Sequence, residues 1–384
     1  MLLALLLGVA CADTSRSRTV TTLPEDLAPP DHVSVVLASG GSLPSIACGG
    51  AWEVLGRDGR QLARGSRLEG GTAPSLSTAD VVLDGRSLGP PPVELRTTGS
   101  SMLRIGGKVY RGSLLLEARA GRSPRLVNQV TVEDYLLGVV AAEMPERFGL
   151  EALKAQAVAA RSYALASVAN GGRLYADTRS QMYGGVASET PLSARAVRET
   201  KGQILTGGNG PLIAWYHSTC GGRTTPARDV FDQAPSRVMD REVVCSDCRN
   251  SPMYAWQRRI TAERVCSAMD LPTGRIDMAG VGNDSLPGRP DRLFVRSGTR
   301  SATLSMATAR ARLSAGRKLS EQVPSTRLAS APRVQGGDLV LDGHGWGHGV
   351  GMCQYGAAGF AARGADYRSI LRRYYPGADL MRMP

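Results

Sequence analysis

Two consecutive helical segments between residues 131 and 168 constrain the fold of this chain more than any other feature. The first, residues 131–143, reads TVEDYLLGVVAAE and repeats its apolar residues at helical spacing until Pro145 ends it. The second, about residues 149–168, carries a narrow apolar stripe and ends before Asn170-Gly171-Gly172. The sequence therefore predicts a helical segment in the middle of the chain.

The residues on both sides of this segment follow a different pattern. Residues 32–126 contain short strand-like runs separated by glycine pairs that are typical of turns. Residues 252–335 mix a short helix, turns and a strand, and the chain ends with a glycine-rich loop and helices at about 352–362 and 367–375. Because strands and helices do not alternate regularly, we predict an α+β fold, sheet-rich and mostly β in its N-terminal portion, and not a doubly wound sheet.

Length and composition favour more than one globular unit. A chain of 384 residues, 42% of them hydrophobic, is too long for one compact core and too apolar to be disordered. We predict a signal at 1–12, a linker at 13–31, a mostly β region at 32–126 and a second domain at 127–384, with a variable segment at 252–335. The net charge of +12 rests mainly on arginine, which favours anionic partners.

The N-terminus has the form of an export signal. Residues 1–12 read MLLALLLGVACA, and the apolar run is far shorter than the roughly 20 residues that span a bilayer. Three alternatives stay open: cleavage before Asp13, a lipoprotein in which Cys11 carries the lipid, or a buried segment of a cytosolic protein. Export would place the protein in the cell envelope, as a periplasmic protein or a membrane-anchored lipoprotein. It also argues against nucleic acid as a partner.

A histidine and three cysteines have the spacing of a metal site. His217 and Cys220 form H-x₂-C, and after a gap of 24 residues Cys245 and Cys248 form C-x₂-C. A C-x₂-C pair can hold one tetrahedral ion from a tight turn, and a second pair of ligands completes the site. The sequence therefore predicts one zinc ion in a closed, structural site. A disulfide, between Cys245 and Cys248 or from either to Cys220, is the alternative that export favours.

Two further features could carry chemistry. Glu143 stands between Ala, Ala, Met and Pro, so burial could raise its pKa as a general acid requires; an exposed helix end is the alternative. The five glycines of residues 343–351 exclude a helical metal motif for His344 and His348. They allow a backbone to approach a ligand lined by His344, Trp346 and His348, unless the segment is a plain turn.

Taken in order, these segments resemble the SpoIID/LytB domain family, which is named for stage II sporulation protein D and an amidase enhancer. The resemblance covers about residues 100–380. The matching strings are Tyr110-Arg111-Gly112, VEDYLLGVV at 132–140, Glu143-Met144-Pro145, LKAQAVAARSY at 153–163, YHSTCGG at 216–222, GHGVGM at 347–352 and QYGA at 354–357.

The resemblance implies a peptidoglycan lytic transglycosylase that acts on glycan strands already stripped of their peptide stems by an amidase. The glutamate of the E-M-P string, Glu143 here, would be the general acid and then the base, and the helical segment would be the catalytic one. Some members bind zinc through His and Cys near the H-S-T string. This favours zinc at Cys220, Cys245 and Cys248. The fourth ligand, His217, is our inference from spacing and competes with a substrate-facing role.

We expect eight further side chains to bind the glycan, although each also has an ordinary structural role as an alternative. They are Lys154, Gln156, Arg161, Tyr163, Ser218, His344, His348 and Gln354. The expected partners are peptidoglycan glycan strands, a cell-wall amidase and, through a lipidated Cys11, a membrane. A second hypothesis is a non-catalytic envelope protein that binds glycan and enhances an N-acetylmuramoyl-L-alanine amidase.

Overall fold

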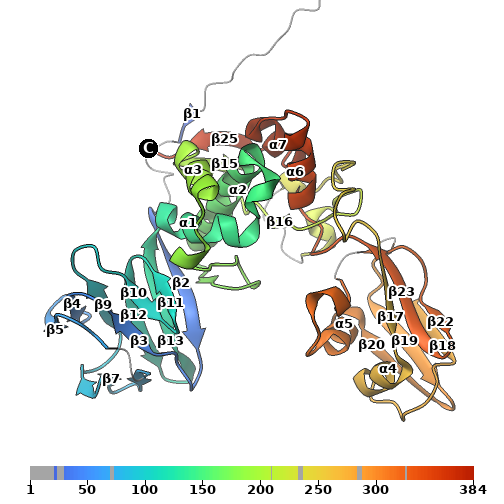
Figure 1. Ribbon diagram of the computed structural model, residues 1–384, viewed down its shortest axis with the longest axis horizontal. Coiled ribbons are helices and arrows are strands. Elements are labelled where there is room, and N and C mark those ends of the chain that lie inside the picture. Colours follow the sequence, from blue (N-terminus) through green and yellow to red (C-terminus); the bar gives the residue numbers. More distant parts are fainter. Residues whose placement is uncertain are drawn as a thin grey trace, which may run out of the picture.

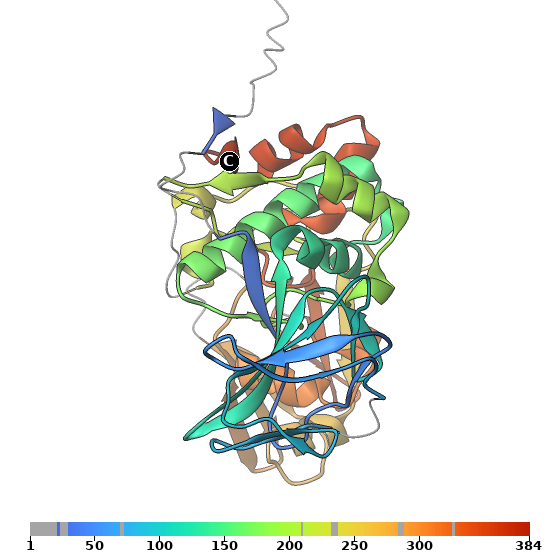
Figure 2. The same ribbon diagram turned by 90° about the vertical axis from the view of Figure 1, so that its left-hand side faces the viewer.

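The computed structural model describes residues 21–384 except 24–29, 70–72, 209, 232–236, 283–287 and 325–326. The signal predicted at 1–12, with Cys11, and most of the linker predicted at 13–31 lie outside the described residues. The described residues form an α+β fold, as predicted. Helices α1, α2, α3, α6 and α7 lie together as one layer, and two β-rich parts, the second of which carries α4 and α5, stand apart beneath it (Figures 1 and 2).

The N-terminal β-rich part is built on a seven-stranded sheet. Its strands, in spatial order, are β14 (Leu174–Tyr175), β2 (His32–Ser39), β13 (Arg122–Thr131), β12 (Ser113–Arg119), β9 (Val93–Thr97), β4 (Trp52–Leu55) and β5 (Gln61–Gly65). Leu114 and Leu116 alternate with less buried residues along β12 and face the core. Two small sheets flank it: β11 (Lys108–Tyr110), β10 (Leu103–Ile105) and β3 (Ile46–Cys48); and β6 (Ser75–Leu76), β7 (Val81–Leu83) and β8 (Arg86–Ser87).

The helical segment follows β13 directly, and its bounds agree with the sequence pattern to within one or two residues. Helix α1 (Val132–Glu143) begins at Thr131, whose hydroxyl accepts a hydrogen bond from the backbone of Asp134 at 3.2 Å. After the 3₁₀ turn η2 (Glu146–Phe148) comes α2 (Leu150–Ala169). Its many buried alanines let α1, α3 (Pro191–Glu199), α6 (Gln354–Ala362) and α7 (Tyr367–Tyr374) pack closely around it.

Strands from distant parts of the chain close the helical layer. The sheet order is β1 (Thr21–Thr22), β25 (Asp379–Arg382) and β15 (Gln203–Thr206). A short parallel pair, β16 (Tyr216–His217) and β24 (Met352–Cys353), aligns His217 with Cys353. The remaining 3₁₀ turns are η3 (Val186–Ser188), η4 (Ala227–Asp229), η5 (Arg237–Met239) and η6 (Leu319–Glu321).

The segment at 252–335, predicted to mix a short helix, turns and a strand, packs together with β23 (Asp338–His344) around a second hydrophobic core that includes Leu293, Val295 and Leu339. One sheet joins β17 (Trp256–Ile260), β23, β21 (Arg327–Leu328) and β22 (Arg333–Gln335). The other joins β18 (Met278–Gly282), β19 (Arg292–Ser297) and β20 (Arg300–Ser305), with helices α4 (Ala262–Ala268) and α5 (Met306–Ser314). Figure 1 shows α5 on the side that faces the rest of the chain.

Strand β23 corrects one detail of the sequence analysis. It extends to His344, so the first residues of the predicted glycine-rich loop at 342–351 are strand. A side chain at Gly343 would lie 2.1 Å from the ring of Trp256 on the paired strand, so only glycine fits there. Within the described residues, no helix is both long and apolar enough to cross a bilayer.

Candidate active site and cysteine cluster

A cavity of about 630 Å³ lies where the end of α1 faces β16 and the loop before β24. It collects six of the predicted site residues: Glu143, Tyr163, His217, Ser218, His348 and Gln354. Among the described residues that line it, Glu143 is the only one with a carboxyl group. The cavity therefore offers one titratable acid surrounded by hydroxyl, amide and aromatic groups.

A second cavity, of about 610 Å³, lies on the N-terminal sheet and is less suited to catalysis. Its acidic and basic side chains form ion pairs with one another. Glu94 pairs with Arg96 at 2.8 Å, and Arg111 pairs with Glu189 and with Asp134. Although burial opposes it, hydrogen bonds from Arg96 and Ser113 lower the pKa of Glu94, which makes its carboxyl a poor proton donor at neutral pH. We therefore place the chemistry in the cavity around Glu143.

Glu143 is the last residue of α1, and its side chain is half-buried. Burial raises the pKa of this carboxyl, and hydrogen bonds from the Met182 backbone, Tyr216 and Gln354 lower it by less. The Met182 N–H donates to Oε1 at 2.6 Å, which fixes the direction of the side chain. The net effect keeps the proton on Glu143 to higher pH than on a solvated glutamate, as a general acid requires.

A short chain of hydrogen bonds orients the phenol next to Glu143. Tyr135 donates its hydroxyl proton to Oε1 of Gln181 at 3.2 Å, and Nε2 of Gln181 donates to the hydroxyl of Tyr216 at 2.9 Å. The Tyr216 oxygen is thus an acceptor from Gln181, and its own proton can be donated to Glu143. Burial raises the pKa of Tyr216 well above its usual value, so it remains a donor. Tyr216 belongs to the YHSTCGG string at 216–222, which by itself predicts no role for the phenol.

The two histidines of the cavity are neutral. Nε2 of His348 lies 2.9 Å from the carbonyl of Tyr216, and its Nδ1 accepts from the N–H of Val350 at 3.1 Å, which places the proton on Nε2. Nδ1 of His217 lies 3.0 Å from the carbonyl of Val350, which places its proton on Nδ1, and its buried Nε2 has no partner among the described residues. Burial lowers the pKa of His217 to about 3 and that of His348 to about 4.

Aromatic rings form one wall of the cavity. Trp215 and Phe231 stack at 4.3 Å between ring centroids, and the His348 ring lies 5.4 Å from Phe231. Trp346 also lines the space. An apolar wall with a few convergent polar groups is typical of small-molecule and sugar sites. The sequence did not identify Trp215 or Phe231, because neither belongs to a motif.

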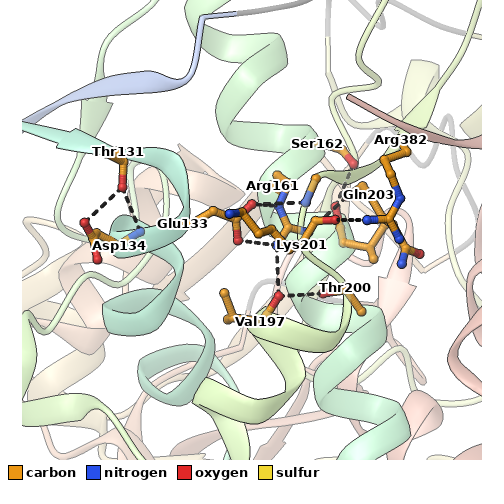
Figure 3. A network of polar contacts seen from close by, with 12 residues as sticks. Thr131, Glu133, Asp134, Arg161, Ser162, Val197, Thr200, Lys201, Gln203 and Arg382 are labelled. Atoms are coloured by element: carbon orange, nitrogen blue, oxygen red, sulfur yellow. Dashed lines mark hydrogen bonds and ion pairs between the residues drawn. The ribbon is translucent and has the colours of Figure 1, made fainter. Parts of the chain in front are cut away.

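Arg161 and Lys154 correct the sequence-based assignment of sugar-binding side chains. Arg161 has no exposed surface, and its Nε and Nη2 each lie 2.8 Å from a carboxylate oxygen of Glu133 (Figure 3). Lys154 bridges Glu151 and Glu199 at 2.8 and 2.7 Å. Both charges are used within the helical layer, and neither residue lines the cavity.

Gln156 and His344 also lie away from the cavity wall. Gln156 is fully buried behind Gln354, whose amide lies 3.4 Å from its Oε1. His344 ends β23, and its Nδ1 lies 3.1 Å from the carbonyl of Tyr254. We therefore assign both a supporting role in place of the predicted contact with glycan.

The cysteines form a cluster of four. Sulfur atoms of Cys220, Cys245, Cys248 and Cys353 all lie within 4.8 Å of one another, and all four residues are buried. The sulfur atoms of Cys220 and Cys248 are 3.5 Å apart, which is too long for a disulfide of about 2.05 Å. This distance is close to the roughly 3.8 Å expected for two thiolates on one tetrahedral zinc ion with bonds of about 2.3 Å. The residues therefore fit the predicted ion.

Cys353 takes the place that sequence analysis gave to His217. The two residues are partners in the parallel pair β16–β24, but only the sulfur of Cys353 joins the cluster, whereas His217 lines the cavity. Spacing within the chain could not identify Cys353, which stands 105 positions after Cys248. Only the pairing of β16 with β24, which are distant in sequence, places Cys353 in the cluster.

Hydrogen-bond donors surround the sulfur atoms of the cluster. The hydroxyl of Tyr374 lies 3.1 Å from Sγ of Cys245, and the N–H groups of Cys220 and Gly356 each lie 3.3 Å from Sγ of Cys353. Hydrogen bonding, first from Cys220, lowers the pKa of Cys245, whereas burial raises the pKa of Cys353. A side chain at Gly356 would come within 2.5 Å of the Cys245 sulfur, so a glycine at this position lets α6 pack directly against the cluster.

Comparison with known proteins agrees with the motifs. The family model described as Stage II sporulation protein matches residues 121–206, which include Glu143. An uncharacterized protein of Brachyspira hyodysenteriae is 31% identical over 286 residues, 72% of this chain and 73% of its own. Stage II sporulation protein D of Bacillus subtilis is 30% identical over 273 residues, 66% of this chain and 75% of its own.

A further relative is longer. The Bacillus subtilis protein named Amidase enhancer is 27% identical over 356 residues, which cover 79% of this chain and 48% of that protein. The extent of the similarity to the sporulation proteins leads to one conclusion: this chain belongs to the SpoIID family.

Proposed function

We propose that this protein is an exported peptidoglycan lytic transglycosylase that cleaves the bond between N-acetylmuramic acid and N-acetylglucosamine in strands without peptide stems. The observation that supports this proposal best is the single carboxyl group among the described residues of the cavity. Glycosidases that use water position two carboxyl groups about 5–9 Å apart. A lyase in which the sugar supplies its own nucleophile needs only one.

The proposed reaction uses Glu143 twice. Its protonated carboxyl gives the proton to the bridging oxygen as the bond from that oxygen to C1 of the muramyl residue breaks. The muramyl C6 hydroxyl oxygen then bonds to C1, and its proton passes to the carboxylate of Glu143. The products are an N-acetylglucosamine end and a 1,6-anhydromuramyl end. No water is consumed and the enzyme regains its starting protonation state.

The surroundings of Glu143 suit both halves of this cycle. Burial favours the protonated acid before cleavage, and the donors Met182 N–H and Tyr216 stabilise the carboxylate that forms. The neutral His217 and His348 compete for no proton at neutral pH. A zinc ion held by the four cysteines would stabilise the fold around β16 and β24 and take no part in the reaction.

A product analysis tests the proposal. Purified protein is incubated with glycan strands pretreated with an amidase, and mass spectrometry measures 1,6-anhydromuramyl ends. We expect these ends with the unaltered protein and none with Glu143→Gln. Glu146→Gln is the matched control, because Glu146 lies three residues further on, outside the cavity, and its contact is the Leu192 N–H at 2.8 Å. Activity that survives in Glu143→Gln would overturn the mechanism.

The same protein preparation distinguishes the proposed enzyme from a second candidate function, an amidase enhancer, which is suggested by the name of one relative. An enhancer would produce no anhydro ends and would instead increase the rate at which a cell-wall amidase removes peptide stems. Adding the protein to an amidase assay on intact peptidoglycan measures this effect. For an enzyme of the proposed kind, Glu143→Gln abolishes strand cleavage, whereas an enhancer keeps its effect on the amidase in that variant.

A further inference from the structure

Arg310 is a cation without a counterion in the wall of the cavity. It lies on α5, and its side chain lines the same space as Glu143. Among the described residues it takes part in no ion pair or hydrogen bond, and its Nε is buried without a partner. A guanidinium keeps its charge in proteins, so it cannot escape burial by losing a proton. A partly buried charge of this kind is costly unless an anion joins it.

The neighbouring charges do not supply that anion. Arg179, which also lines the cavity, is paired with Asp177 at 2.7 Å. Arg289 donates to the carbonyl of His348 at 2.8 Å; burial, and after it repulsion from Arg327 and Arg310, lowers its pKa to about 10. The local field near Arg310 is therefore positive and attracts anions.

Glu143 is not the missing counterion either. The leading influences on its pKa are burial, Met182, Tyr216 and Gln354, and no guanidinium is among them. A close guanidinium would lower the pKa of this carboxyl strongly, and it is instead raised. The two groups thus line one cavity of about 630 Å³ without neutralising each other.

We propose that Arg310 binds the lactyl carboxylate of a muramyl residue from which the peptide stem has been removed. This inference rests on the proposed function and names the group that selects its substrate. Removal of the stem turns a neutral amide into a carboxylate, the only charge on a strand of N-acetylated sugars. A guanidinium binds a carboxylate with two parallel hydrogen bonds and leaves an amide poorly matched. A retained stem would also have to share the space next to the guanidinium.

Arg310, which would select the substrate, and Glu143, the proposed general acid, belong to different parts of the chain. Glu143 belongs to residues 121–206, which match the family model, whereas Arg310 belongs to the segment with its own hydrophobic core. The segment joins the rest of the site through β23, which leads directly to Trp346 and His348. Substrate choice can therefore change with this segment while the catalytic helix stays the same.

A binding experiment with the Glu143→Gln variant, which should bind glycan without cleaving it, tests the inference. Isothermal titration calorimetry compares two muramyl tetrasaccharides, one with free lactyl carboxylates and one with the same groups as methyl amides. We expect the free acid to bind at least about tenfold more tightly, as for a hydrogen bond to a charged group. Arg310→Gln should remove this preference, and Arg310→Lys should keep part of it. Arg312→Gln is the control on the same helix, since Arg312 pairs with Asp270 outside the cavity.

Two results would overturn the inference: equal binding of the two oligosaccharides, or a preference that Arg310→Gln leaves unchanged. Thermal unfolding of each variant shows that the comparison is made on folded protein. Binding is measured without cleavage, so the outcome is separate from that of the proposed function. A preference for the acid together with no anhydro product would retain Arg310 as a carboxylate receptor and reject the lyase.

Discussion

The backbone carbonyl of Glu143 accepts a hydrogen bond from the side-chain amide of Gln354 at 3.2 Å, although the two residues are 211 positions apart. Gln354 directly follows Cys353, one of the four clustered cysteines. The end of the acid-bearing helix is therefore held by a residue whose neighbour belongs to the proposed zinc site. Loss of the cluster should affect Glu143 through this contact, without any role for the ion in the reaction.

The first prediction concerns the fourth ligand of the cluster. Native mass spectrometry should find one zinc ion in the protein and none in Cys353→Ser, because three thiolates hold the ion less well than four. Cys266→Ser should retain zinc, since Cys266 is buried in the core of the 252–335 segment. His217→Ala should also retain it. Zinc that is lost from His217→Ala and kept in Cys353→Ser would restore the sequence-based assignment, and a mass two daltons low without metal would indicate a disulfide.

The second prediction concerns the phenol beside the acid. Tyr216 stabilises the carboxylate form of Glu143, so Tyr216→Phe should raise the pKa of Glu143 further. The rate depends on the protonated acid and falls as pH rises through this pKa, so the alkaline limb of the pH–rate profile should move to higher pH. Tyr254→Phe, outside the cavity, should leave the limb in place. A shift to lower pH in Tyr216→Phe would contradict the assigned hydrogen bond.

The third prediction links catalysis to stability. The pKa of Glu143 is raised on folding, so its contribution to the free energy of unfolding is present below the unfolded pKa and is lost as pH rises through the folded pKa. Glu143→Gln removes this pH-dependent loss and can still accept from Met182, so it should raise Tm at pH 7. The difference should shrink as pH falls below about 4, near the unfolded pKa of glutamate. Equal Tm values at all pH would indicate a solvated carboxyl.

The fourth prediction concerns the ion pair in Figure 3. Arg161 also donates to the carbonyl of Gln203 at 3.0 Å, so it joins α1, α2 and β15. Arg161→Ala leaves Glu133 without its counterion and should lower the free energy of unfolding by about 3–5 kcal/mol in urea denaturation. Arg195→Ala breaks a solvated pair with Glu199 and should cost about 0.5 kcal/mol or less.

A double variant distinguishes this structural role from glycan binding. Glu133→Gln with Arg161→Met removes both charges and should recover part of the lost stability. If the role is structural, this folded double variant should bind stripped glycan strands as well as the unaltered protein does. Weaker glycan binding at unchanged stability would instead support the original assignment of Arg161 to substrate.

Local patterns predicted the parts of the structure that depend on neighbours in sequence. The bounds of α1 and α2 followed from apolar spacing, from Pro145 and from the glycines after Asn170, because helix formation and termination are local. Glu143 was identified through the resemblance of its Glu143-Met144-Pro145 string to the family, because its apolar neighbours alone left an exposed helix end as the alternative. The C-x₂-C pair of Cys245 and Cys248 likewise carries its geometry within four residues.

The sequence alone thus determined the α+β class, the helical segment with its acid, and three of the four clustered cysteines. Tertiary structure alone decided that Cys353 and not His217 completes the cluster, that Arg161 is an internal ion pair, and that Arg310 enters the cavity of Glu143. The physical reason is that these roles depend on which distant surfaces pack together. The free energy of that packing is spread over the whole core, and no short pattern of residues encodes it.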